Sequence, residues 1–123
     1  MYRYLILAMI SFGVNSHQFT PTYPVLQQSH MPNVLKLKMQ ILNKREDVSY
    51  YELEVMDESG NPVEFAAQQK IIEIGFLQRK NIEVYIRRRD KDLAHYVCTR
   101  SKILTGQKKA SAVSSKICSK IIK

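Results

Sequence analysis

Apolar and polar residues alternate with a period of two through the middle of the chain. Residues 35–41 (LKLKMQI) place four apolar side chains on one face and three polar side chains on the other. Residues 51–55, 72–74 and 82–86 repeat this pattern. Strict alternation is typical of half-buried antiparallel strands, whereas helical spacing would bring two lysines of the first window next to the apolar stripe. The pattern therefore predicts a strand in each of these four windows.

Turn signals separate the predicted strands. Residues 43–47 (NKRED) follow the first window, and residues 57–62 (DESGNP) follow the second. Gly60 tolerates a positive φ, and Pro62 cannot donate a hydrogen bond to a central ladder. Residues 75–80 are expected to form the next corner.

Three further stretches extend the pattern. Residues 19–24 (FTPTYP) predict an extended edge segment, because each Pro pushes the residue before it toward extended geometry. Residues 96–99 (YVCT) predict another strand. Near the C-terminus, Val113, Ile117 and Ile121 have helical spacing, but residues 116–121 also alternate, and we favour a final strand.

Six to seven short strands, with turn signals roughly every 8–12 residues, are typical of a sandwich of two sheets. The 123 residues are 45% hydrophobic and 24% charged, which fits one globular domain. We therefore predict an all-β, immunoglobulin-like β-sandwich of about seven antiparallel strands over residues 17–123. The expected core residues are Leu35, Leu37, Met39, Ile41, Leu53, Val55, Ile72, Ile74, Ile82, Val84 and Ile86.

The first sixteen residues have the features of a secretory signal peptide. Arg3 precedes an uncharged stretch at 5–14 (LILAMISFGV), and Asn15 and Ser16 follow as short polar residues. The stretch is shorter than the roughly 20 apolar residues that span a bilayer. We expect residues 1–16 to be cleaved, leaving a periplasmic or secreted chain without a transmembrane segment. A buried N-terminal strand or helix is the alternative.

Cys98 and Cys118 are the only cysteines. An even number of cysteines in an exported chain favours a disulfide, which would tie the basic C-terminal segment 103–123 to the sandwich. Closing a loop of about 20 residues stabilises by roughly 3 kcal/mol in the chain-entropy model. Two buried free thiols are the alternative. His17, His30 and His95 have no metal-ligand spacing, and we predict neither a metal nor another cofactor.

Charge is divided unevenly within the net +8. Residues 17–78 carry five basic and eight acidic side chains, whereas residues 79–123 carry thirteen basic and three acidic ones. Such asymmetry steers an acidic protein or an anionic surface, although a charge run is also compatible with a solvated face. Export disfavours nucleic acid as the partner. The candidate partner-binding residues are Arg87, Arg88, Arg89, Lys91, Arg100 and Lys102.

Sequence motifs of catalysis are absent. No G-x-S-x-G surrounds a serine, and four glycines form no phosphate-binding loop. Glu52 and Glu54 share the outward face of a predicted strand, which fits a wet surface better than an acid–base pair. Cys98 could act as a nucleophile only if it is unpaired. We therefore expect a protein that is not an enzyme.

The strand pattern resembles the immunoglobulin-like N-terminal domain of periplasmic pilus chaperones over about residues 33–100. The resemblance rests on a strand that ends in Asn43, an alternating strand after it, the Gly-Asn-Pro turn and the later segment KNIEVYI. In that family, an Arg in the first strand and a Lys in the last strand hold a subunit's terminal carboxylate. Lys102 or Arg100 stands in the position of that Lys, and no Lys or Arg between His17 and Val34 matches the Arg. The resemblance implies an exposed edge strand that pairs with a partner's strand.

These observations lead to two main hypotheses. The first is a non-enzymatic exported module that binds another envelope or appendage protein by edge-strand pairing, as in pilus-chaperone-like, secretion, conjugation or phage-related assemblies. The second is a secreted effector or inhibitor whose basic loop, residues 87–91, blocks an acidic site on its target. A third, a small exported hydrolase, requires a pocket with convergent polar groups.

Overall fold

A computed structural model describes residues 17–102 and 115–123 of the chain. In these residues the chain forms nine strands and a single 3-10 turn, η1 (Arg88–Asp90). No helix in the described part is long and apolar enough to cross a membrane. The predicted signal peptide (1–16) and much of the basic C-terminal segment (103–114) lie outside the described residues.

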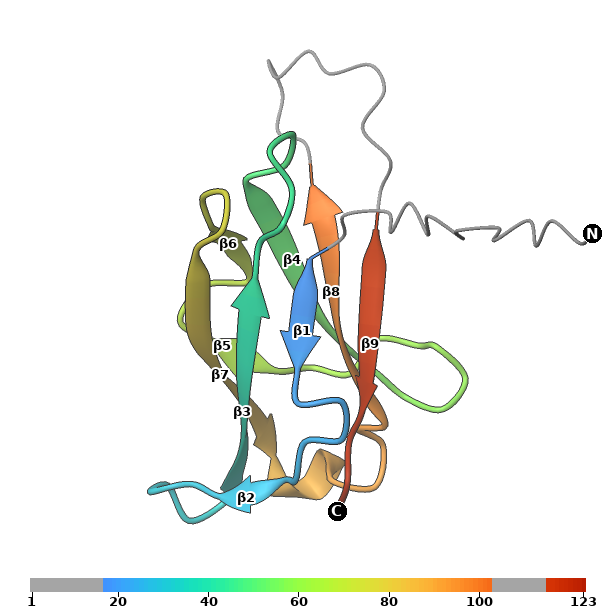
Figure 1. Cartoon of the computed structure of the whole chain (residues 1–123). Helices are drawn as coiled ribbons and strands as arrows, with labels where there is room; N and C mark the ends of the chain where they lie inside the picture. The colour runs from blue at the N-terminus through green and yellow to red at the C-terminus, as the bar shows by residue number, and fades with distance from the viewer. Residues whose placement is uncertain (1–16, 103–114) are drawn as a thin grey trace, which may run out of the picture.

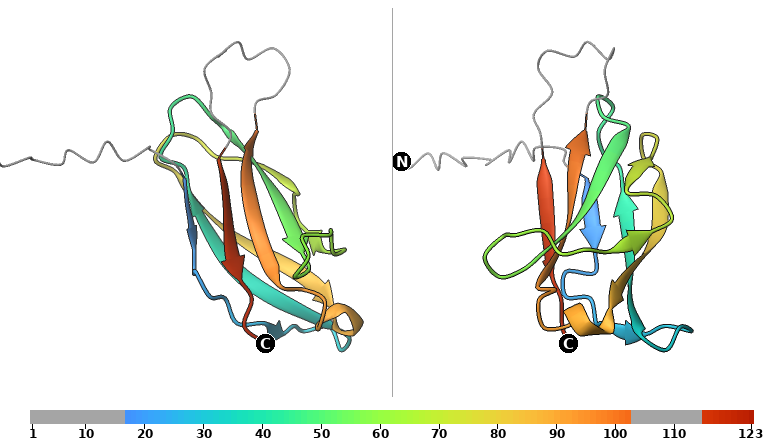
Figure 2. Two further views of the ribbon diagram at one scale, coloured as in Figure 1. Left: turned by 90° about the vertical axis from the view of Figure 1, so that its right-hand side faces the viewer. Right: turned by 180° about the vertical axis from the view of Figure 1, so that it is seen from behind.

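Two sheets stack face to face (Figures 1 and 2). The first contains β1 (Gln18–Thr20), β2 (Gln27–Gln28), β3 (Val34–Leu42), β5 (Ala66–Ala67) and β7 (Arg79–Arg87). Its order is β1-β3-β7-β5, and β2 also pairs with β3. The second sheet has the order β6-β4-β8-β9. Its strands are β4 (Tyr50–Met56), β6 (Ile71–Glu73), β8 (Tyr96–Lys102) and β9 (Lys116–Lys120).

The longest ladders pair β3 with β7 and β4 with β8. β3 and β7 pair over nine positions, from Val34 opposite Arg87 to Leu42 opposite Arg79. β4 and β8 pair over seven positions, from Tyr50 opposite Lys102 to Met56 opposite Tyr96. Every pairing between these strands is antiparallel. The predicted all-β sandwich is therefore confirmed, although it contains nine strands, four of which have only two or three residues.

The core lies between the inner faces of the two sheets. Ten of the eleven predicted core residues are buried. Ile82 is half-buried, at a position of β7 that pairs with β3 but not with β5. A fully buried Leu, Ile or Val stabilises the fold by roughly 1.5–3 kcal/mol. Further core residues lie outside the predicted set: Phe19, Val48, Tyr51, Val63, Ala94, Val97 and Ile121.

Three local predictions are tested by the structure. The final strand is confirmed, because β9 pairs with β8 and is not a helix. The corner expected at residues 75–80 is shorter, since β7 begins at Arg79. The extended edge segment is confirmed in part: β1 ends at Thr20, and the following peptide bond to Pro21 is cis.

Candidate functional site

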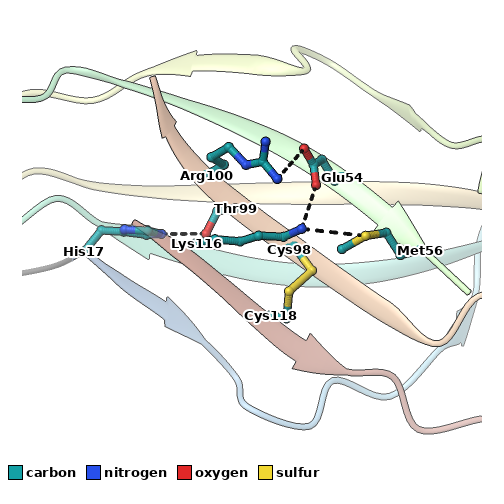
Figure 3. Close-up of a disulfide and its surroundings, with 8 residues drawn as sticks. All are labelled: His17, Glu54, Met56, Cys98, Thr99, Arg100, Lys116 and Cys118. Atoms are coloured by element: carbon teal, nitrogen blue, oxygen red, sulfur yellow. Dashed lines mark hydrogen bonds and ion pairs between the residues drawn. A yellow bond between two sulfur atoms is a disulfide. The ribbon is translucent and has the colours of Figure 1, made fainter. Parts of the chain in front are cut away.

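The outermost strand of the second sheet, β9, is held by the disulfide. Cys118 lies directly opposite Cys98 of β8, their sulfur atoms are bonded, and their Cα atoms are 4.0 Å apart (Figure 3). The predicted bridge is confirmed. Opposed residues with side chains on one face meet most closely at non-hydrogen-bonded positions of an antiparallel pair. The disulfide therefore joins the strands without replacing a ladder hydrogen bond.

The direction of the backbone groups of β9 follows from the bonds at its two ends. Ser101 N–H donates to Ser115 O at 2.9 Å, and Ile121 N–H donates to His95 O at 2.9 Å. Odd-numbered residues of this strand therefore bond to β8, and even-numbered residues direct their N–H and C=O groups away from it. Lys120 N–H accordingly donates outward, to Thr22 O at 3.2 Å. Lys116 and Cys118 retain outward backbone groups without a backbone partner in the described part of the chain.

Past this open stretch, an extended segment covers the lower part of β9. Ile122 N–H donates to Pro24 O at 2.8 Å, and Leu26 N–H donates to Ile122 O at 2.8 Å. These bonds belong to a short parallel bridge between Val25 and Ile122. The free edge of β9 is thus limited to its first half.

Acidic and basic side chains alternate across the outer face of the second sheet. Lys102 Nζ lies 3.2 Å from Glu52 Oε2. Glu54 receives two cations, Lys116 Nζ at 3.3 Å and Arg100 Nη2 at 3.8 Å (Figure 3). The outward face predicted for Glu52 and Glu54 is confirmed, and the two cations predicted to bind a partner, Arg100 and Lys102, already have acidic neighbours. Their side chains are still 43% and 39% exposed.

The basic loop predicted at residues 87–91 contains η1. Arg87 makes two ion pairs, with Glu64 Oε2 at 2.9 Å and with Asp90 Oδ2 at 3.1 Å. Arg88 donates a hydrogen bond to the side chain of Gln28. Arg89 and Lys91 make no ion pair within residues 17–102 and 115–123. Of the four cations in this loop, Arg87 is thus the one that makes ion pairs, whereas Arg88 and Arg89 are exposed and Lys91 is half-buried.

A buried histidine links β9 and β8 to the start of the first sheet. His17 Nε2 lies 2.7 Å from Thr99 Oγ1, and Nδ1 lies 3.1 Å from Ser115 Oγ. The ring packs against Tyr51 with a centroid distance of 4.5 Å. Burial, and secondarily the positive charge of Arg45, lowers the pKa of His17 to about 4. The imidazole is therefore neutral at pH 7, and its contacts tie the edge strand to the core.

Asn43 caps the end of β3 within a second buried polar group. Its Nδ2 donates to Val48 O at 2.7 Å and to Ile74 O at 2.8 Å. Its Oδ1 accepts from Arg45 N–H at 2.9 Å and from Tyr51 Oη–H at 2.5 Å. Burial raises the pKa of Tyr51 to about 12, so the phenol keeps its donor proton. The sequence marked Asn43 as a strand end but gave no sign of the Tyr51 contact.

In the described residues, neither the His, Cys, Asp and Glu side chains nor the cavity beside the basic loop forms a metal site or an acid–base pair. No group of three or more His, Cys, Asp or Glu side chains within them could hold a metal ion. A surface cavity of about 690 Å³ is lined by Asn33, Val34 and the arginines 87–89. This lining offers cations but neither a nucleophile nor a carboxylate, so it provides a surface for anionic groups and no acid–base pair.

No protein-family model matches the sequence, and no curated protein matches it at a significant level. Solved structures do match. The E. coli chaperone DraB has a TM-score of 0.63 and 14% identity, covering 86% of this chain and 53% of DraB. The periplasmic chaperone SfaE has a TM-score of 0.61 and 8% identity, covering 86% of this chain and 56% of SfaE.

A third similar structure is the PapD-like domain 7 of human CEP192, with a TM-score of 0.57 and 6% identity, covering 87% of this chain and 82% of that domain. The chain spans only about half the length of the two chaperones it matches. At these identities the likeness concerns the fold. The resemblance predicted from the strand pattern is confirmed at that level: the chain folds as an immunoglobulin-like sandwich similar to that of the periplasmic chaperones.

Proposed function

We propose that this protein is a non-enzymatic binding or assembly module of the cell envelope that adds a partner's strand to the open edge of β9. The observation that carries the proposal is the pair of residues Lys116 and Cys118, whose outward N–H and C=O groups have no backbone partner in the described residues. Such groups are a template for β-augmentation, in which main-chain hydrogen bonds provide affinity. The partner is another envelope or appendage protein.

The fold supports a protein-binding role. DraB and SfaE, which share it, are both described as chaperones. The disulfide adds a physical argument. It holds the edge strand against β8 in the absence of a partner, so less conformational freedom is lost when a partner binds. Components of secretion, conjugation or phage-related assemblies fall within the same proposal.

Export is part of this proposal. A disulfide persists in an oxidising compartment such as the periplasm, and residues 1–16 have the pattern of a signal peptide. The mass of the intact mature protein should show the loss of about sixteen residues and of the two hydrogens of the cysteine thiols. A cytoplasmic protein that keeps its leader and two free thiols would contradict this placement.

Cations of the basic loop and of the second sheet are proposed to guide the partner. Arg88, Arg89 and Lys91 are those with the fewest contacts in the basic loop, and they would attract an acidic partner and accelerate association. Arg100 and Lys102 lie on the same sheet as β9, where a partner carboxylate could exchange with Glu54 or Glu52. We thus assign the edge to affinity and the cations to recognition.

The experiment places a photo-crosslinking residue at Lys120, which is exposed on β9, in cells that produce the full chain. Lys116→Pro removes one outward N–H, whereas the ladder bonds to β8 come from odd-numbered residues and remain. Lys116→Ala is the matched control, because it removes the charge and keeps the N–H. We expect the partner's crosslink to be lost with Lys116→Pro and kept with Lys116→Ala, both variants melting as the parent does. Equal crosslinking in both would contradict strand pairing at β9.

A further inference from the structure

A second open edge lies on the opposite side of the sandwich, along β7 (Figures 1 and 2). On one side β7 pairs with β3 over its whole length. On its other side only Val84 and Tyr85 are paired, with Ala67 and Ala66 of β5. On the side away from β3, the first five residues of β7, 79–83, therefore have no strand beside them in the described residues.

The backbone groups at this edge are oriented for pairing. Arg88 N–H donates to Asn33 O at 2.9 Å, and Asn43 N–H donates to Gln78 O at 3.0 Å. Even-numbered residues of β7 therefore bond to β3, and odd-numbered residues face away from it. The N–H groups of residues 79, 81 and 83 and the C=O groups of residues 79 and 81 thus point to the open edge, where the described part of the chain provides no backbone partner.

A cavity of about 320 Å³ lies along this edge, where β7 meets the segment that leads from β5 to β6. Ile72 and Ile82 contribute apolar surface to it, and Gln68, Gln69 and Asn81 contribute polar groups. Ile82 faces the core but is only half-buried, whereas Val84 on the same strand is fully buried. An apolar side chain from an added strand would complete the cover of Ile82.

The two ends of the open stretch carry opposite charges. Glu83 stands at one end, and Arg79 and Lys80 stand at the other. Arg79 makes no ion pair within the described residues, and Lys80 Nζ donates only to a backbone oxygen, that of Glu73, at 3.3 Å. A strand added antiparallel would meet Glu83 first and Arg79 last, so a basic first residue and acidic last residues complement the edge.

We propose that residues 79–83 of β7 form a second peptide-binding site, which takes a five-residue extended segment of another protein. The segment runs antiparallel to β7, with a basic first residue opposite Glu83, an apolar second residue over Ile82 and acidic residues opposite Lys80 and Arg79. The bound segment is limited to five residues, because β5 already pairs with Val84 and Tyr85 at one end and β7 begins at Arg79 at the other. This site is independent of the β9 edge, and with both sites one module would bind two partner segments.

The probe for this site is the peptide acetyl-Lys-Val-Thr-Glu-Glu-amide, added to the full chain while amide hydrogen exchange is followed by NMR. At a peptide concentration ten times Kd, we expect exchange at the N–H groups of residues 79, 81 and 83 to slow by about tenfold. Residues 80 and 82, already bonded to β3, should not change. The charge-reversed peptide acetyl-Glu-Val-Thr-Lys-Lys-amide should bind about tenfold more weakly, the effect of about 1.4 kcal/mol.

Two kinds of variant separate the site from a general effect on folding. Asn81→Pro removes the central outward N–H and should abolish binding, whereas Asn81→Ala keeps that N–H, removes only the side-chain amide from the cavity lining, and should weaken binding far less. Glu83→Lys should lower the affinity for the probe and raise the affinity for a peptide that begins with Glu instead of Lys. A misfolded chain could not show this exchange of preference.

The proposal is overturned if exchange at residues 79, 81 and 83 does not slow at about 10 mM peptide, about ten times a weak Kd of 1 mM. It is also overturned if both peptides act equally, or if these amides are protected without peptide as protein concentration rises, which would mean that a second copy occupies the edge. The Lys116 variants test the β9 edge alone, so either proposal can fail without the other.

Discussion

The two open edges of this sandwich, on β9 and on β7, are held in place in different ways. The β9 edge is short, is held by a disulfide, and is covered in its lower half by residues 22–26. The β7 edge is longer and has no disulfide, but the nine-position ladder with β3 holds it in place. Both strands on which we propose partner binding are thus fixed on their inner side, one by a disulfide and the other by a long ladder.

Removal of the disulfide should separate the two edges most strongly. In the double variant Cys98→Ser, Cys118→Ser we expect the free energy of unfolding to fall by about 3 kcal/mol, the chain-entropy value for a loop of roughly 20 residues. Native-state amide exchange should accelerate at β9 and stay nearly unchanged at β7. The parent protein in a reducing agent is the control and should behave as the variant does. Equal acceleration at both edges would break the comparison.

Acidification should also loosen the β9 side first, through His17. Its pKa in the folded protein, about 4, lies below the ordinary value of 6.5, so the unfolded chain binds more protons between these two values. The free energy of unfolding should therefore decrease as the pH falls through this window, by at most about 1.4 kcal/mol per pH unit.

Urea denaturation at pH 7 and pH 5 measures this effect, and His17→Gln provides the comparison. The amide side chain cannot titrate, so the variant should have a flatter dependence of stability on pH in this window, whatever its stability at pH 7. An identical slope in parent and variant would show that His17 does not control the effect.

The charged face beside β9 should contribute less. Glu54→Gln leaves Lys116 and Arg100 without their shared carboxylate, and exposed ion pairs of this kind contribute less than about 1 kcal/mol. Thermal melting at low and high salt measures the difference, which should shrink as salt is added. A loss that salt does not change would mean that Glu54 supports β9 by packing.

The basic loop should have the smallest effect on stability and a distinct effect on binding. Replacing Arg88, Arg89 and Lys91 with Ser should leave the melting temperature unchanged, because none of them makes an ion pair in the described residues. Association with the partner should slow and depend less on salt, without loss of the complex. Replacing Lys36 and Lys38, on the exposed face of β3, is the control. Abolished binding would favour the alternative in which this loop blocks an acidic target.

Alternation along the chain predicted ten buried residues of the core, because successive side chains of a strand point to opposite faces, but it missed seven others. It could not predict which strands lie side by side. Arg100 and Lys102 were expected to face a partner, but β8 lies next to β4, and Glu54 and Glu52 are therefore their nearest counter-ions.

The open edges were beyond prediction for a related reason. The edge of β7 is open because β5 has only two residues, which pair with Val84 and Tyr85 alone. The site around Asn43 depends on its hydrogen bonds with Tyr51, Ile74 and Val48, which belong to different strands and loops. Open edges and buried polar contacts are decided by which strands pair in the folded chain, and the alternation of the sequence does not contain that information.

The most direct test of strand pairing at β9 is amide hydrogen exchange in the complex with the partner captured by crosslinking at Lys120. We predict new protection at the N–H groups of Lys116 and Cys118, which face outward in the free chain, and no change at Ile117, which already bonds to β8. Protection confined to Arg88, Arg89 and Lys91, with Lys116 and Cys118 exchanging as in the free chain, would contradict the account.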